Sequence, residues 1–110
     1  MGYNTDFDGA FTVTPALKVR HRLQLAKFAE ESWGRHGSSC QWVPTDDGTA
    51  LQWDGNEKFY DYVEWIDRLI SRFLRPWGYE VNGEVRWRGE DFDDMGTIVV
   101  TKNKVETRSR

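Results

Sequence analysis

The chain has 110 residues, of which 30% are charged, and its formal net charge is −3. This length predicts one domain over residues 1–110. The charged fraction argues against both disorder and a membrane span, and no apolar run approaches the ~20 residues that a spanning helix needs. Cys40 is the single cysteine, so an internal disulfide is excluded and a reducing cytoplasm is expected. The first six residues predict no secretory signal.

Charge is distributed unevenly along the chain. Residues 1–43 carry +1, residues 44–96 carry thirteen acids and six bases for −7, and residues 97–110 carry +3. A protein that binds nucleic acid directly usually presents a basic stripe. The acidic middle of the chain therefore disfavours direct nucleic-acid binding.

The N-terminal third predicts a strand followed by a helix. Apolar and polar residues alternate over residues 7–13, which is typical of a half-buried strand. Thr14 and Pro15 resemble a helix start, with Thr14 as the N-cap and Pro15 at the first helical position. The first helix is therefore expected over residues 15–33, with Gly34 as its C-terminal cap.

Two short strands are expected next. Residues 40–43 alternate like a strand, and residues 44–48 begin with Pro and end with Gly, which favours a turn. Residues 49–53 return as the partner strand. The pair therefore predicts a β-hairpin between the two helices.

Residues 54–74 show the clearest pattern in the chain, an amphipathic helix. Asp54 and Glu57 resemble a capping box, and Pro76 predicts that the helix ends near Leu74. Trp65 lies at the flank of the apolar side and is the candidate for an exposed aromatic anchor. At about 100° per residue, one side carries apolar residues and the opposite side carries acids: Phe59, Val63, Ile66, Ile70, Phe73 and Leu74 against Glu57, Asp61 and Glu64.

The C-terminal third reads as a meander with strands expected at 79–81, 85–88, 97–101 and 105–107. Asn82-Gly83 is a strong hairpin signal. If Val81 and Val85 share the core face, a two-residue loop would bury the wrong side chains, so a three-residue loop or a bulge is expected. The fold class predicted is α+β, with a mostly antiparallel sheet of about five strands and two helices packed on one face.

Residues 90–94 place four carboxylates in one short loop that ends before Gly96: Glu90, Asp91, Asp93 and Asp94. Such oxygens can bind calcium, but the spacing does not match a twelve-residue calcium loop. A solvated hairpin turn is the favoured interpretation, since Asp and Gly prefer turns.

The remaining chemistry-bearing residues predict no catalytic or metal site. His21, His36 and Cys40 lack the paired spacing of a zinc site. His21 is expected at the edge of the core, and Cys40 is expected to be a small buried side chain and not a nucleophile. No phosphate loop, nucleophile elbow or metalloprotease motif is present, so neither a cofactor nor an enzymatic activity is expected.

Several stretches resemble a family of small uncharacterised proteins from bacterial and phage genomes. They are Gly-Tyr-Asn-Thr-Asp-Phe at residues 2–7, Cys-Gln-Trp at 40–42, the run 53–65 and the run 82–91. Family members are longer between the first helix and Cys-Gln-Trp. The resemblance implies a phage or mobile-element setting, and it implies no reaction and no catalytic residues.

The sequence therefore favours a non-enzymatic, protein-binding domain of phage or mobile-element origin, an anti-CRISPR-like inhibitor of host defence in the host cytoplasm. Dense carboxylates imitate phosphates, so an acidic surface can cover the basic channel of a nucleic-acid-binding host protein. The residues expected to bind this partner are Glu57, Asp61, Glu64, Trp65, Glu90, Asp91, Asp93 and Asp94.

Two alternatives remain at this point. One is an antitoxin that neutralises a cognate toxin by the same kind of contact. The other is a small metal-dependent hydrolase that uses the carboxylates of residues 90–94 to hold a divalent metal.

Overall fold

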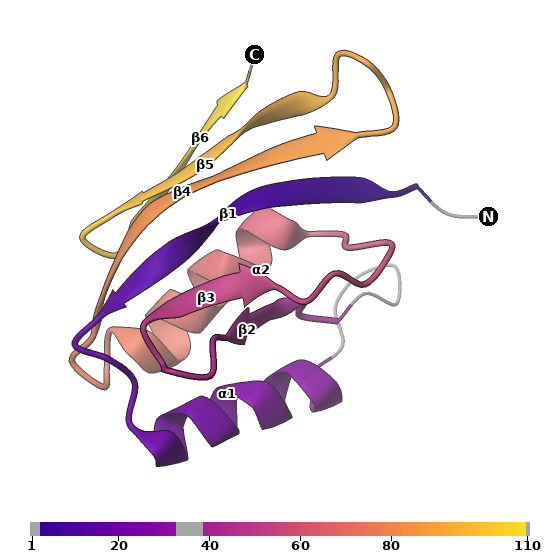
Figure 1. The fold of residues 1–110 in the computed structure, drawn as a ribbon. Helices are drawn as coiled ribbons and strands as arrows, with labels where there is room; N and C mark the ends of the chain where they lie inside the picture. The colour runs from indigo at the N-terminus through magenta and orange to yellow at the C-terminus, as the bar shows by residue number, and fades with distance from the viewer. Residues whose placement is uncertain (1–2, 33–38, 110) are drawn as a thin grey trace.

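One six-stranded antiparallel sheet organises the molecule, with strand order β2-β3-β1-β4-β5-β6 (Figure 1). The structure is a computed structural model that describes residues 3–32 and 39–109. Its elements are β1 (Thr5–Thr14), α1 (Val19–Glu31), β2 (Trp42–Pro44), β3 (Ala50–Trp53), α2 (Tyr62–Leu69), the π-helical η2 (Ile70–Leu74), β4 (Glu80–Gly89), β5 (Met95–Thr101) and β6 (Lys104–Ser109). The predicted α+β class is confirmed, and the sheet has six strands where about five were expected.

Strand β1 forms as predicted, but the helix start at Pro15 is wrong. Thr14 pairs with Glu80 as the last residue of β1, so it cannot act as an N-cap. Helix α1 begins at Val19, after Lys18 in an extended conformation. It ends at Glu31, and the expected boundary at Trp33 and cap at Gly34 lie outside the described residues.

The predicted hairpin of β2 and β3 is confirmed, with Trp42 opposite Trp53. Its turn is held by the Asp47 carboxylate, which accepts hydrogen bonds from the Thr45 hydroxyl at 2.8 Å and the Thr49 hydroxyl at 2.7 Å. These hydrogen bonds lower the pKa of Asp47 to about 2, and those from Thr49 have the largest effect.

The predicted start of the second helix is also wrong. The Asp54 side chain accepts a hydrogen bond from the backbone N–H of Asn56 at 2.9 Å, so it forms a local turn instead of a capping box. Helix α2 begins only at Tyr62, because Asp61 adopts a left-handed conformation with φ 56°. The expected end near Leu74 is confirmed, since α2 continues into η2 and stops there.

The expected hairpin at Asn82-Gly83 does not form, because β4 is one continuous strand. Gly83 pairs with Phe11 on one side and with Val100 on the other. It has φ 132°, and a Cβ there would lie 2.9 Å from the Ala10 carbonyl oxygen, so glycine serves a close approach of β1 and not a turn. An unbroken strand also puts Val81 and Val85 on one face without a bulge.

The core lies between the sheet and the helices. Figure 1 shows α2 across one face of the sheet and α1 beside β2. The side chains of Ile66, Ile70 and Leu74 are completely buried, as the apolar stripe predicted. Phe28 joins α1 to this layer, with ring centroids 6.0 Å from Trp65 and 5.0 Å from Phe73.

Candidate protein-binding surface

Tyr3 connects two acidic segments that are far apart in the sequence. Its hydroxyl donates to Asp94 Oδ2 at 2.7 Å and accepts the backbone N–H of Asp91 at 3.0 Å. Its own backbone N–H donates to the Tyr60 hydroxyl at 3.1 Å. The start of β1 is therefore bound both to the β4–β5 turn and to the segment that precedes α2.

Asn4 makes a second bridge between the same segments. Its backbone N–H donates to the Glu90 carboxylate, and its side-chain oxygen accepts the backbone N–H of Lys58 at 3.2 Å. Two consecutive residues thus tie residues 58–60 to residues 90–94, and we call this pair, Tyr3 and Asn4, the N-terminal clamp.

Gly89 provides the space for the clamp. A Cβ at this position would lie 2.2 Å from Asp94 Oδ2 and 2.3 Å from the Tyr3 hydroxyl oxygen, so any side chain would displace their hydrogen bond. The other carboxylate oxygen of Asp94 accepts a hydrogen bond from Trp87 Nε1 at 3.1 Å. Asp94 is therefore a structural residue of the turn and is half-buried, whereas Glu90, Asp91 and Asp93 are exposed.

The three acids expected on one helix face occupy three different kinds of position. Glu57 is exposed in the segment before α2, Asp61 is the half-buried N-cap, and Glu64 is exposed in the first helical turn. The prediction that these three acids share one helix face was wrong, because the helix begins later than predicted.

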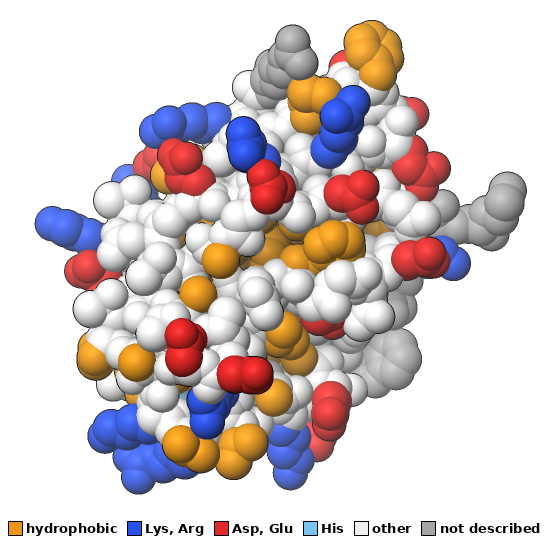
Figure 2. Space-filling model, in the orientation of Figure 1, with side chains coloured by type: hydrophobic (Ala, Val, Ile, Leu, Met, Phe, Trp, Pro, Cys, Tyr) orange, Lys and Arg blue, Asp and Glu red, His pale blue; other side chains and the backbone are white. Residues whose placement is uncertain are grey.

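The clamp nevertheless brings both acidic groups to one end of the molecule. Tyr62, at the start of α2, is half-buried beside them: burial raises the pKa of its phenol to about 12, and Asp94, Tyr3 and Glu64 add smaller contributions in that order. We call the combined surface the acidic end, made of Glu57, Asp61, Glu64, Glu90, Asp91, Asp93 and Asp94. Figure 2 shows acidic side chains around the β4–β5 turn, which lies at the upper right in both views.

Trp65 is not an exposed anchor, contrary to prediction. Only 2% of its surface is exposed, since Phe28 of α1 packs against it. The Arg68 guanidinium lies 4.6 Å from the centroid of its ring. The flank of α2 on which Trp65 lies is therefore covered by α1.

Phe92 is the exposed aromatic residue that the sequence interpretation missed. It is 87% exposed in the middle of the β4–β5 turn, between Asp91 and Asp93. The sequence did contain a signal for this exposure. One large apolar residue stands among four acids in a predicted turn, where it has no apolar neighbours to pack against. Aromatic residues, Phe among them, are enriched at the centres of protein interfaces.

The β4–β5 segment forms the hairpin turn that was predicted, with the Asp94 N–H bonded to the Asp91 carbonyl oxygen at 3.0 Å. Among residues 3–32 and 39–109, no group of three His, Cys, Asp or Glu side chains is placed to hold a metal ion. The carboxylate of Asp94, a proposed metal ligand of the hydrolase alternative, is occupied by Tyr3 and Trp87.

His21 and Cys40 have the structural roles expected for them. The His21 ring stacks on Trp77 with centroids 3.9 Å apart, and its Nδ1 lies 2.8 Å from the Tyr79 hydroxyl. Burial raises the pKa of the Cys40 thiol to about 12, which opposes thiolate formation. His36 lies outside the described residues.

Comparisons with known proteins add no assignment. No family model matches the chain, and no curated protein and no solved structure is significantly similar to it. The resemblance to the phage and bacterial family therefore stays a prediction. Of the helices in the described part of the chain, none has the length and apolar character needed to cross a membrane.

Proposed function

We propose that this protein is a non-enzymatic binding domain that attaches through its acidic end to a basic surface of a partner protein. The observation that carries the proposal is the N-terminal clamp. The hydrogen bonds of Tyr3 and Asn4 bind the two acidic segments to each other, across 54 and 57 residues on one side and 86 to 91 on the other. A surface fixed in this way presents its charges without the ordering cost that separate loops would bring.

Phe92 gives the acidic end an apolar centre. A ring that is 87% exposed can bury nearly its whole surface in a partner pocket. The neighbouring carboxylates of Asp91 and Asp93 would then face basic residues at the rim, where they raise the association rate more than the affinity. This combination of an aromatic anchor and a charged rim is typical of protein interfaces.

The partner proposed is a nucleic-acid-binding protein of the host, and the function is inhibition of a host defence system in the anti-CRISPR manner. Carboxylates spread over one end can occupy a channel built for phosphates. The phage or mobile-element setting implied by the sequence resemblance agrees with such a role. An antitoxin would use the same surface, and a toxin as the partner would assign the protein to that class.

The test compares two charge-reversal variants with equal net charge. The first carries Glu64→Lys, Asp91→Lys and Asp93→Lys, and it spares Glu90 and Asp94 because their carboxylates hold the clamp and the turn. The control carries Glu30→Lys, Glu31→Lys and Glu84→Lys, which are exposed on α1 and β4. Binding to the purified partner is measured by surface plasmon resonance at two salt concentrations, after affinity capture from host lysate has named it.

The acidic-end variant should lose more than about tenfold in association rate, and the wild-type rate should itself fall as salt rises. The control should change by about twofold or less. If both variants bind as well as the wild type does, the acidic end is not part of the interface. Equal loss in both would show that only net charge matters.

A further inference from the structure

A second feature lies on the face of the sheet that points away from α2. It is a groove of about 670 Å³ that crosses β1, β4, β5 and β6. Phe7 and Trp87 point into the core, so the residues that alternate with them point away from α2. The volume falls within the range of small-molecule sites.

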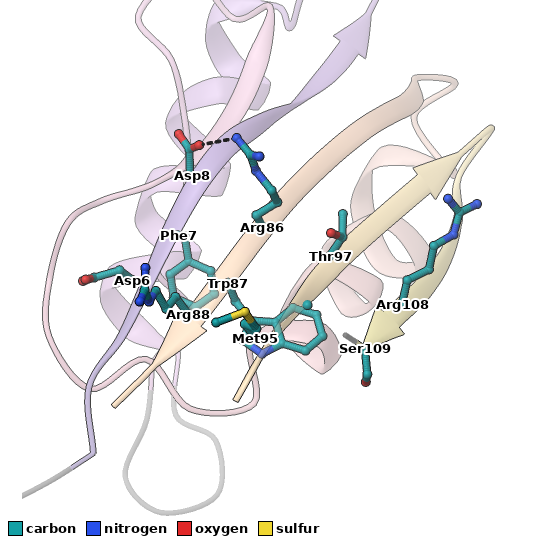
Figure 3. A pocket seen from close by; sticks show the side chains of 11 residues that line it. Asp6, Phe7, Asp8, Arg86, Trp87, Arg88, Met95, Thr97, Arg108 and Ser109 are labelled. Atoms are coloured by element: carbon teal, nitrogen blue, oxygen red, sulfur yellow. Dashed lines mark hydrogen bonds and ion pairs between the residues drawn. The ribbon is translucent and has the colours of Figure 1, made fainter. Parts of the chain in front are cut away.

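Strand register arranges the polar side chains of the groove in a row. Asp8 lies opposite Arg86, Arg86 opposite Thr97, and Thr97 opposite Arg108. Figure 3 shows Thr97 between the two arginines, whose guanidinium groups stand on either side of it. Four neighbouring strands thus place two guanidinium groups and one hydroxyl along a single line.

Charge along this row is only partly neutralised. Arg86 forms an ion pair with Asp8 at 2.8 Å. Arg88 lies opposite Asp6 in the register, yet within the described part of the chain neither Arg88 nor Arg108 forms an ion pair. These two guanidinium groups are therefore available to an anion from outside.

The groove also has an apolar part. Met95 lies opposite Arg88 and belongs to the lining, and the methylene stems of the arginines cover the strands between the charged ends. Methionine is polarizable and adapts its shape to flat or aromatic surfaces. A ligand that satisfies both parts needs an anionic group and an apolar body.

We propose that this groove binds a small molecule in which a carboxylate or phosphate is attached to a flat apolar body. The anionic group contacts Arg108, where a guanidinium group can donate two parallel hydrogen bonds, and the Thr97 hydroxyl donates a third. The body lies over Met95 toward Arg88. Arg86 keeps its contact with Asp8 and forms the wall of the groove.

The test uses four probes on the full chain, observed by two-dimensional ¹H–¹⁵N NMR. Benzoate and phenyl phosphate carry both the ring and the anion, benzamide lacks the charge, and inorganic phosphate lacks the ring. Benzoate or phenyl phosphate should shift amides of β4, β5 and β6 with millimolar affinity, and the tighter of the two identifies the anionic group. Benzamide and inorganic phosphate should bind about tenfold more weakly.

Two substitutions on one strand supply the matched control. Arg108→Gln and Lys104→Gln remove the same charge from the same face of β6, but only Arg108 lines the groove. Arg108→Gln should weaken the tighter probe about tenfold, and Lys104→Gln by about twofold or less. Arg88→Gln, which leaves β6 intact, should weaken it as well.

Three results would overturn the proposal. The first is the absence of amide shifts with all four probes. The second is equal binding of benzamide or inorganic phosphate, which would show that the ring and the anion are not recognised together. The third is an equal loss in the Arg108 and Lys104 variants, which would indicate adsorption to general positive charge.

Discussion

Helix α2 and the segment before it come from one continuous run of sequence, but they are held in place by different forces. In α2, Trp65, Ile66 and Leu69 are each at most 2% exposed. Residues 54–61 bury only one side chain to this degree, Phe59 at 1% exposure. They contain left-handed backbone at Lys58 and Asp61, and hydrogen bonds with Asn4 and Tyr3 hold the rest of the segment. Burial that repeats every three or four residues can be read from sequence, whereas a contact between residues 3 and 60 leaves no periodic trace.

The largest effect expected from this contrast is at Ile66. Ile66→Asp places an unpaired carboxylate at a position with 0% exposure, facing the sheet. We expect a loss of about 4 kcal/mol or more in the free energy of unfolding, which is a large part of the roughly 5–15 kcal/mol that keeps a typical domain folded. Circular dichroism with urea titration measures it. Glu64→Gln, exposed in the same helix, should change stability by less than about 0.5 kcal/mol, and comparable losses in the two variants would contradict the assigned face.

The same contrast explains how much of the fold the sequence predicted. Strand β1, the hairpin of β2 and β3, the stripe of α2 and the end at Leu74 all depend on alternation, helical period or proline, and they were predicted correctly. The capping box at Asp54 and the hairpin at Asn82-Gly83 were wrong. The capping box was replaced by another local bond, from the Asn56 N–H to the Asp54 side chain. The hairpin signal was overridden by tertiary contacts, namely the pairing of Gly83 with both neighbouring strands.

Prediction of the candidate site was partial for a related reason. Composition identified the acids of the acidic end, and turn chemistry located residues 90–94 correctly. The mutual placement of the two groups depends on Tyr3, Asn4 and Gly89, which carry no charge and match no motif with a known chemical role. Exposure of Trp65 was predicted wrongly because it depends on how α1 packs, and the periodicity of α1 is weak.

Gly89→Ala should disrupt the geometry of the acidic end without changing its charges. The new Cβ would displace the Asp94 carboxylate and the Tyr3 hydroxyl. We expect a loss of about 1–3 kcal/mol in the free energy of unfolding, together with new amide shifts in residues 90–94. Combining Gly89→Ala with Tyr3→Phe should cost less than the sum of the two single changes, because removal of the hydroxyl relieves the clash. Strict additivity would show that the two residues do not interact.

Tyr3→Phe should have a smaller and more local effect. It removes the hydroxyl that bonds to Asp94 and to the Asp91 N–H, and it leaves the ring in place. We expect a loss of about 1 kcal/mol, with faster amide hydrogen exchange at Asp91 and unchanged exchange in the core of α2. Slowed or unchanged exchange at Asp91 would mean that the clamp does not hold the turn.

The smallest effect concerns His21, which the sequence analysis correctly predicted to lie at the edge of the core. Burial, with Arg20 and Lys18 nearby, lowers the pKa of His21 below its usual value of 6.5. Below pH 6.5 the unfolded chain therefore binds more protons at this position than the folded protein does, so the free energy of unfolding falls as the pH falls.

Urea titrations at pH 7.5 and pH 5.5 measure this dependence. The difference in unfolding free energy between the two pH values should shrink in His21→Phe, which cannot titrate but retains a ring to stack on Trp77. His36→Gln is the control, because it removes the only other histidine. If His36→Gln reduces the pH dependence and His21→Phe does not, the stack of His21 on Trp77 does not determine stability in this pH range.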